Sequence, residues 1–520
     1  MDKKNIFTGA FALVFAGIAG KVISASYRIP LQNLTGDIGF YIYQQIYPLI
    51  GIAITFALYG LPSAAAAFII DKRLKSGNKR MMQRIFHLLF LLGVFLFFIL
   101  FLCSPMLADL MGDRQLISPI RHVAWLFLFM PFVAYYRGRL QAMNDLQSIA
   151  NSQMVEQLTR AFIIIITAIW IYQGKITIYR IADGAVIGTV IAFTASFLLL
   201  YFIWKKKYAN REEIHLINIP YSELFKHVLL TGIVISMNHM MLLFMQLADA
   251  FTILPGLVES GMTQKEAMKW KGIFDRGQPL LQLVTIVGSS FAMALVPQVT
   301  KIAWQQDKEG SIRHLMTAMK YCLLISLGAT VGLILLMPEI NELFYKNMDG
   351  SNSLRILSIV LLFTALSLTM ASVLQGLGYM KWIAIVLFTA LLLKMMLNSL
   401  LVPTFSINGA AIATILSIGF IAISYLYILQ KHVIKEQIRI IPVGRVFIAA
   451  ISMIAGLLLL KYIEVNYFII DTRVERLISV LVSVFTGFAL YFFSLVRLRV
   501  FTQKELETLP FMNKWIKKER

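Results

Sequence analysis

Apolar runs of about 20 residues recur from one end of the chain to the other. A helix needs about 20 such residues to cross the roughly 30 Å hydrocarbon core of a bilayer. The chain is 58% hydrophobic and 14% charged, whereas soluble domains are roughly a quarter charged. The runs lack the alternation of a transmembrane barrel. They predict an all-α polytopic membrane protein with 14 transmembrane helices, at 6–27, 40–70, 86–110, 118–138, 153–173, 181–204, 227–250, 278–299, 318–338, 355–377, 382–402, 409–430, 443–463 and 476–496.

The placement of positive charge predicts the topology. With the N-terminus in the cytoplasm, 31 of the 48 lysines and arginines fall in inner segments, which include 72–84, 137–139 and 205–226. Another 14 fall on the outer side, and three lie within spans. Because inner loops of membrane proteins are enriched in basic residues, both termini are predicted to be cytoplasmic. The net charge of +21 therefore reflects topology and the anionic inner leaflet, and no nucleic-acid partner is expected.

No enzymatic signature is present. The chain contains no CxxC, HExxH, GxxxxGK[ST] or GxSxG pattern, so we expect no metal, no cofactor and no catalytic residues. Cys103 and Cys322 lie in different apolar runs and are interpreted as core residues. The N-terminal run resembles a secretory signal but is too long, and we predict that it is retained as a span. A membrane glycosyltransferase would need a motif such as DxD, which the chain lacks.

Internal similarity indicates a duplicated chain. Three short matches recur in the same order, at offsets of 234, 231 and 225 residues: 140–144 with 374–378, Pro48-Leu49 with Pro279-Leu280, and 183–185 with 408–410. We expect two six-helix lobes related as parallel repeats, plus two extra C-terminal helices. The predicted parts are an N-lobe at 1–204, a cytoplasmic linker at 205–226, a C-lobe at 227–430, helices 13 and 14 within 431–497, and an amphipathic cytoplasmic tail at 498–520.

Several cations stand where lipid is expected. Lys21 and Arg28 interrupt the first apolar run, and Arg276 precedes the eighth. A charge in the hydrocarbon core is costly, so such residues usually face a bundle interior or a wet cavity. We interpret the three as a site for an anionic substrate; the alternative is that each reaches to the nearest interface. Pro30, beside Arg28, predicts an early end of the first helix, with an ordinary proline kink as the alternative. Further breaks are marked by Pro48, Pro62, Pro279 and Pro297, where an ordinary kink is the favoured interpretation of any single proline.

Other polar residues inside the spans are candidates for secondary roles. Glu156 and Arg160 are spaced to pair on one helix face, which favours a structural role over ion coupling. Asp249 is a candidate coupling carboxylate or a residue of the outer interface. Lys394 could line the cavity, bind a coupling anion or extend outward to the interface. Amides, acids and phenols near the cations are expected to line the cavity, with an interfacial aromatic belt as the alternative for the tyrosines: Asn33, Tyr41, Tyr43, Gln44, Gln45, Tyr47, Asp275 and Gln278.

Three stretches carry a resemblance to a known family: YRIPLQNLTGDIGFYIYQQIYPLIGIA, LQAMND followed by NSQMVEQLTR, and GIFDRGQPLLQL. They resemble the MOP superfamily, in the Gram-positive polysaccharide-biosynthesis branch of SpoVB-type and MurJ-type lipid II flippases. The resemblance covers essentially the whole chain. It implies a two-lobed transporter of the bacterial cytoplasmic membrane that moves undecaprenyl-pyrophosphate-linked saccharides, such as peptidoglycan precursors, from the inner to the outer leaflet.

The same resemblance implies a binding site. Lys21 and Arg28 match the two first-helix cations of the MurJ pattern, and Arg276 matches its eighth-helix arginine, so all three are expected to bind the pyrophosphate. The pattern often has an aspartate directly after the second arginine, where this chain has Ile29. Asp275, next to Arg276, is the candidate for the balancing carboxylate.

Two functions are compatible with these residues. The first is flipping of a lipid-linked saccharide, with membrane lipids and a coupling ion (H⁺ or Na⁺) or the membrane potential as the other partners. The alternative is a drug/cation antiporter of the same superfamily. Such antiporters bind cationic drugs at a membrane-embedded acid, whereas the first six spans here carry cations and the apparently paired Glu156. That balance favours an anionic ligand.

Overall fold

The computed structural model describes residues 3–71, 79–208, 220–282, 307–433 and 442–501. Every regular element in these ranges is a helix, which confirms the all-α class. The amino half contains α1 (Lys3–Thr55), the π-helix η1 (Phe56–Gly60), α2 (Leu61–Asp71), α3 (Lys79–Leu102), α4 (Ser104–Leu110), the 3₁₀ turn η2 (Arg114–Leu116), α5 (Ile117–Ala142), α6 (Leu146–Tyr172) and α7 (Arg180–Lys207).

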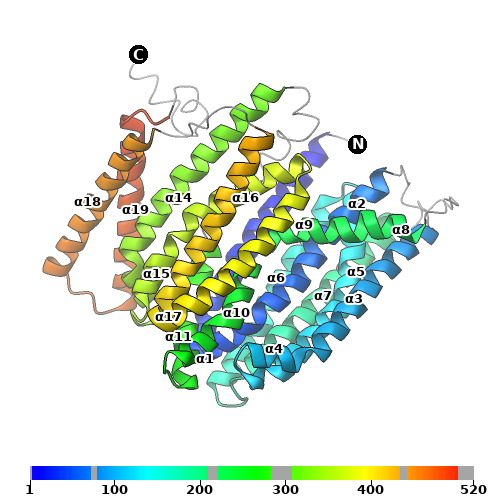
Figure 1. Ribbon diagram of the computed structural model, residues 1–520, viewed down its shortest axis with the longest axis horizontal. Helices are drawn as coiled ribbons and strands as arrows, with labels where there is room; N and C mark the ends of the chain where they lie inside the picture. Colours follow the sequence, from blue (N-terminus) through cyan, green and yellow to red (C-terminus); the bar gives the residue numbers. More distant parts are fainter. Residues whose placement is uncertain (1–2, 72–78, 209–219, 283–306, 434–441, 502–520) are drawn as a thin grey trace.

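The carboxyl half begins with a segment that lies across the other helices in Figure 1 and then continues as long helices. Its elements are α8 (Tyr221–Leu224), the π-helix η4 (Phe225–Leu230), α9 (Thr231–His239), α10 (Met241–Glu259), α11 (Gln264–Asp275), α14 (Lys308–Tyr345), α15 (Ser351–Ser358), α16 (Val360–Gly376) and α17 (Met380–His432). Two further helices follow, α18 (Val443–Tyr467) and α19 (Arg473–Arg497).

Eleven helical segments of the described residues are long and apolar enough to cross a membrane. Two of them reverse direction at one residue with non-helical angles, Gly36 in α1 and Ser406 in α17. The hydroxyls of Tyr27 and Tyr43 lie 2.6 Å apart, whereas 16 residues of straight helix would span about 24 Å. These segments therefore account for thirteen of the predicted spans. The eighth, at 278–299, lies mostly outside the described residues.

The sequence predicted a break at Pro30, but the first hairpin reverses at Gly36. Gly36 has φ 69° and ψ −177°, which a residue without a Cβ adopts without strain. Pro30 lies inside α1, and Pro48 also lies inside a helix. Prolines are tolerated in membrane helices because neighbouring groups satisfy the carbonyl that a proline leaves free. A helix irregularity does precede Pro62, where η1 separates α1 from α2.

Three other predicted boundaries change. The fourth span, predicted at 118–138, continues as α5 to Ala142, and Arg137, which was counted with the inner segments, is fully buried. The seventh span is not 227–250: the helix breaks at Met240, and the membrane-length helix is α10, from Met241 to Glu259. Most of the predicted linker and tail, at 209–219 and 502–520, lies outside the described residues.

The helices pack as two groups joined along one seam. In the amino half α1 packs on α6, α6 on α7, and α5 on α2, α3 and α7. In the carboxyl half α17 packs on α10, α15 and α16, and α16 on α14. A separate apolar cluster joins α18 and α19 to α14, at the edge of the molecule in Figure 1. The beginning of α1 and the end of α19 lie at the same end of the bundle (Figure 1), which we call the inner end.

The turns after α5 and α16 have the same hydrogen bonds. The amides of Met143, Asn144 and Asp145 donate to Arg139, Gln141 and Leu140, and those of residues 377–379 donate to 373, 375 and 374. Asn144 and Gly378 both have positive φ, as expected for the residue that ends a helix in this way. These are the 140–144 and 374–378 segments that match in sequence, so the local structure supports duplication. The boundaries of the two lobes stay a prediction.

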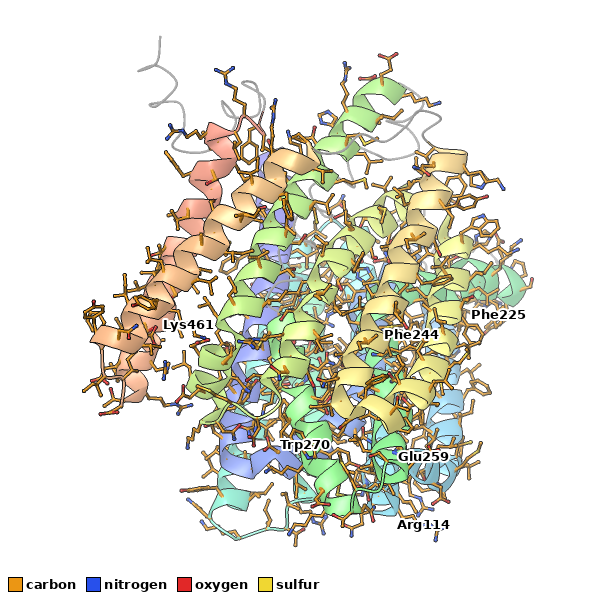
Figure 2. The ribbon with its side chains drawn as sticks, turned by 60° about the vertical axis from the view of Figure 1, so that its left-hand side comes forward. Arg114, Phe225, Phe244, Glu259, Trp270 and Lys461 are labelled. Atoms are coloured by element: carbon orange, nitrogen blue, oxygen red, sulfur yellow. The ribbon has the colours of Figure 1, made fainter. Side chains whose placement is uncertain are left out.

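Close contacts join the two halves near both ends. Toward the inner end a Cβ added to Gly60 would lie 2.1 Å from the carbonyl oxygen of Gly232. Toward the other end, which we call the outer end, a Cβ added to Gly272 would lie 2.1 Å from the carbonyl oxygen of Asp37. Figure 2 shows Arg114 and Glu259, one from each half, together at the outer end. The two halves therefore touch through their backbones at both levels, on either side of the space between them.

Candidate functional site

A polar cavity of about 240 Å³ lies between the two halves. It is lined by α1, η1 and α6 of the amino half and by α9, α10 and α16 of the carboxyl half. Among its described lining residues are two of the predicted cations, Lys21 and Arg28, together with Arg160, and there is no Asp or Glu. The remaining polar side chains are mostly amides and hydroxyls: Ser24, Tyr47, Thr55, Tyr59, Gln153, Gln157, Asn238, His239, Gln246, Gln278, Gln282 and Ser372.

Arg28 lies in the wall of this cavity and is 1% exposed. The reversal at Gly36 brings the second part of α1 against the first, so that the guanidinium carbon of Arg28 is 4.1 Å from the ring centroid of Tyr47 and 6.0 Å from that of Tyr43. Such stacking stabilises a cation without neutralising it. Its Nε and Nη2 atoms have no hydrogen-bond partner among the described residues. Arg28 therefore presents buried donors for which the described residues supply no acceptor.

Arg276 is placed differently from Arg28. It is fully buried, and its Nε and Nη2 atoms donate to one carboxylate oxygen of Asp37 at 3.0 and 2.6 Å. Its Nη1 atom donates to Asn347 at 2.7 Å. Arg276 is not among the described residues that line the cavity. In this structure it joins the two halves near the outer end, and a site shared with Arg28 stays a prediction.

We had expected the carboxylate of Asp275 to balance the charge of Arg276, and it does not. Its carboxylate oxygens accept from the Nζ atom of Lys271 at 2.6 and 2.7 Å, and the carboxylate that contacts Arg276 belongs to Asp37. Residues 275 and 276 are consecutive, so a helical arrangement points their side chains in different directions. Lys271 lies four residues before Asp275, and this spacing was a signal for the pair that actually forms.

The other residues expected to line the cavity divide into two sets. Gln278 lines it and accepts a hydrogen bond from Gln246 at 2.9 Å. Asn33 instead donates to the carbonyl of Phe344 across the two halves. Tyr43 is buried behind Tyr47, and Gln44 is buried away from the cavity lining. Because Tyr41 and Tyr43 are at most 1% exposed, the aromatic-belt alternative is wrong for them.

Glu156 lies between two arginines. The predicted pair with Arg160 is present at 2.5 Å, and Arg137 donates to the other carboxylate oxygen at 2.8 Å. All three side chains are at most 5% exposed, so one carboxylate balances two buried guanidinium groups and leaves one positive charge in excess. Arg137 was predicted only as part of the inner segment 137–139, at the end of the fourth span. The triad is structural on its Arg137 side and reaches the cavity through Arg160.

Replacing Glu156 with glutamine is expected to destabilise the protein by about 1.5–3 kcal/mol, the range for hydrogen bonds to charged groups. The amide keeps one accepting oxygen but loses the charge that both arginines share. The transport rate of the folded protein should change little, because Arg160 keeps its charge at the cavity. The thermal unfolding midpoint of the purified protein measures the effect, with exposed Glu259→Gln as the matched control. An unchanged midpoint would mean that the triad contributes nothing to stability.

Asp249 and Lys394 form a buried pair in the carboxyl half. The Nζ atom of Lys394 donates to Asp249 at 2.7 Å and to the carbonyl of Met245 at 3.0 Å. Asn398 donates to the second oxygen of Asp249 and to Thr252. The charged side chains are at most 2% exposed, so neither reaches an interface and both interfacial alternatives are wrong. Asp249 lies mid-way along α10 because that helix extends to Glu259.

Several lining residues were not singled out from the sequence. Gln153 and Gln157 come from α6, and Tyr59 from η1. His239 ends α9 and stacks on Tyr59 with 4.2 Å between ring centroids. Amides spaced four residues apart on one apolar helix were the available signal for Gln153 and Gln157. No sequence pattern marks Tyr59 or His239.

Comparison with known proteins agrees with this architecture. Residues 6–303 match the family model described as polysaccharide biosynthesis protein. The chain is 34% identical over 516 residues to the uncharacterized membrane protein YabM of Bacillus subtilis, covering 98% of this chain and 96% of that protein. It is 23% identical over 537 residues to the lipid II flippase MurJ of the same organism, covering 96% of this chain and 97% of MurJ.

The fold has a solved counterpart. The structure of lipid II flippase MurJ in an inward closed conformation superposes with a TM-score of 0.68 at 14% identity. The match covers 94% of this chain and 99% of the MurJ chain. The chain therefore belongs to the polysaccharide biosynthesis protein family and is a membrane transporter of the MOP superfamily, related to the lipid II flippase MurJ.

Proposed function

We propose that this protein moves an undecaprenyl-pyrophosphate-linked saccharide, lipid II or another cell-wall or polysaccharide precursor, from the inner to the outer leaflet by alternating access. The observation that carries the proposal is the state of the Arg28 side chain. It is a buried guanidinium with two unpartnered nitrogen atoms, in a cavity whose described lining holds three cations and no carboxylate. A buried charge of this kind is tolerated where a counter-charge binds.

The cavity chemistry suits both parts of such a headgroup. A guanidinium presents donors in a planar fork that matches phosphate oxygens, and the charge strengthens each hydrogen bond. Gln153, Asn238 and Gln246 offer amides that can exchange hydrogen bonds with sugar hydroxyls. The 240 Å³ cavity is smaller than a whole lipid-linked saccharide, so the proposal requires the halves to separate before the substrate enters.

The two contact regions between the halves are the candidates for gates. The Asp37–Arg276 pair joins the halves toward the outer end, and the Gly60–Gly232 contact joins them toward the inner end. Opening them in alternation would expose the cavity to one leaflet at a time. H⁺, Na⁺ or the membrane potential would supply the driving force. In this proposal the protein resides in the bacterial cytoplasmic membrane with both termini cytoplasmic, the orientation that the positive-inside rule favours.

A defined experiment separates this function from the drug/cation antiporter. The purified protein in proteoliposomes is expected to move a fluorescent undecaprenyl-pyrophosphate-linked disaccharide between leaflets, which a membrane-impermeant quencher measures. Its expression should also restore growth to a bacterium depleted of its lipid II flippase, if lipid II is the precursor carried. Protein-free liposomes give the background. Accumulation of a cationic dye without any saccharide movement would contradict the flippase and support the antiporter.

A further inference from the structure

A second polar cavity, of about 180 Å³, lies between the carboxyl half and the α18–α19 hairpin. Its walls come from α14, α15, α18 and α19. Glu339 is six residues before the end of α14 and Lys461 six before the end of α18, or about 9 Å of helix. Figure 2 shows Lys461 on the side of the hairpin that faces the other helices. The cavity therefore lies near the membrane interface at the outer end.

Positive and negative charges are balanced in this cavity. Its described lining holds two carboxylates and two cations: Glu339, Glu464, Arg355 and Lys461. Lys461 donates to one oxygen of Glu339 at 2.5 Å. Arg476 lies against Glu464 at 2.9 Å and Glu342 at 3.0 Å, and so adds one charge of each sign. A ligand with net charge would leave a charge uncompensated here, whereas a zwitterion would not.

One acceptor in the cavity is left without a donor. The Oε2 atom of Glu339 has no hydrogen-bond partner among the described residues, and Glu339 is 8% exposed. A buried carboxylate oxygen of this kind favours a ligand that donates an N–H or O–H group. Arg355 offers the opposite chemistry. Its Nε atom donates to the carbonyl of Ile334 and its Nη1 atom to Asn352, both uncharged groups, so its positive charge is available to an anion.

An apolar groove of about 290 Å³ adjoins the cavity. The two spaces share three lining residues: Glu464, Ser479 and Ser483. Most of the groove wall is apolar: Leu460, Ile463, Phe468, Ile469, Ile470, Ile478 and Val482. Ile478 and Val482 are 56% and 50% exposed, so the groove opens at the surface of the hairpin, where acyl chains surround a membrane span. A polar cavity beside an apolar groove matches the head and the chain of a lipid.

We propose that the cavity and the groove bind one phospholipid with an ethanolamine headgroup. Its ammonium donates to Glu339, its phosphate accepts from Arg355, and one acyl chain lies in the groove. Phosphatidylethanolamine has no net charge, as the balanced cavity requires. Phosphatidylglycerol is anionic, and the choline headgroup of phosphatidylcholine has no N–H to donate. This site is separate from the cavity between the halves, and the inference does not depend on the proposed function.

The spacing of the two charged groups suits this headgroup. Arg355 is anchored at the carbonyl of Ile334, which precedes Glu339 by five residues on α14, or about 7.5 Å along the axis. A phosphate and an ammonium two carbons apart span this distance with one hydrogen bond of about 2.9 Å at each end. Glu339 lies closer to the outer end than Ile334. The ammonium of a lipid in that leaflet likewise lies farther out than its phosphate.

Binding of lipids with identical acyl chains tests the site. The full-length protein in detergent micelles is titrated with phosphatidylethanolamine, phosphatidylcholine and phosphatidylglycerol, and native mass spectrometry measures each dissociation constant. Phosphatidylethanolamine is expected to bind about tenfold tighter than either of the others, because a hydrogen bond to a charged group is worth about that much. Glycerophosphoethanolamine, the same headgroup without acyl chains, should not displace it.

Variants assign the preference to residues. Glu339→Gln should abolish the preference for phosphatidylethanolamine and leave the affinity for phosphatidylcholine unchanged. The Lys461 side chain is 45% exposed, so it does not become a buried unpaired charge in this variant. Arg355→Gln should weaken binding of all three lipids alike, because all three carry the phosphate. Glu259→Gln, exposed at the outer end, is the matched control. A wild-type unfolding midpoint establishes that each variant is folded.

The wild-type comparison does not depend on any variant. Equal affinity of the wild type for the three lipids overturns the proposal, and so does tightest binding of phosphatidylglycerol, because the cavity would then select net negative charge. A preference that survives in folded Glu339→Gln overturns the assignment of the ammonium to that carboxylate. Full displacement by glycerophosphoethanolamine overturns the role of the groove. None of these outcomes alters the proposed transport function.

Discussion

Replacing Arg28 with alanine is expected to abolish transport of the lipid-linked saccharide while the protein stays folded in the membrane. The change removes two unpartnered donors from the cavity wall. Each charge-assisted contact to a phosphate is worth about 1.5–3 kcal/mol, so the loss of two is more than a hundredfold in binding. Stability should suffer little, because the lost stacking on Tyr47 is offset by removal of a buried charge.

The chemistry of the side chain gives a graded series. Arg28→Lys keeps the charge but loses the planar fork, so partial transport is expected. Leaflet exchange in proteoliposomes measures the series, with protein amounts matched by blot. Arg114→Ala is the matched control, because Arg114 is 81% exposed and pairs with Asp109 at the outer end. Full transport by Arg28→Ala would rule out an anionic substrate at this site and move the drug/cation antiporter to first place.

Replacing Lys394 with alanine is expected to destabilise the protein by about 3–5 kcal/mol, the cost of leaving one partner of a buried ion pair uncompensated. Asp249 would lose its ammonium partner in a region where it is 2% exposed. Asn398 still donates to Asp249, but an amide does not neutralise the carboxylate. The nearby Lys271–Asp275 pair is itself engaged and offers no replacement cation.

A double substitution separates the pair from its surroundings. Lys394→Met combined with Asp249→Leu removes both charges, and apolar replacement of a whole buried pair is often neutral. The double variant should therefore regain most of the stability that Lys394→Ala loses, as measured by denaturant unfolding of the purified protein. Arg114→Ala breaks an exposed pair and should cost at most about 1 kcal/mol. Wild-type stability of Lys394→Ala would show that the pair is energetically unimportant.

The transmembrane helices were largely predictable. Residues 443–463 and 476–496 were predicted as spans, and the structure has α18 from Val443 to Tyr467 and α19 from Arg473 to Arg497. The reason is physical: a chain in hydrocarbon must satisfy its backbone hydrogen bonds internally, so each apolar run of sufficient length forms a helix whatever its neighbours. Around Met240 one apolar run covers two helices, α9 and α10. The predicted end of the span at 250 therefore differs by more than a helical turn from the observed end of α10 at Glu259.

Helix breaks were less predictable than the helices. Proline marks a lost hydrogen bond, but neighbouring groups in a bundle can restore it, so α1 passes through Pro30. Gly36 is where the chain reverses, since its backbone adopts angles that other residues avoid. The composition of the NLTGDIG stretch allowed that turn, and packing of the first hairpin selected it.

The sequence by itself determined the membrane-embedded helical class, the local Glu156–Arg160 pair and the presence of inward cations at 21 and 28. These follow from the length of apolar runs and from the helix period, which brings residues four apart together. The tertiary structure alone decided that Arg276 pairs with Asp37, that Lys394 pairs with Asp249 and that Arg137 shares Glu156. These partners lie on different helices, and their meeting depends on the depth and rotation of each helix in the bundle, which the pattern within a single helix does not encode.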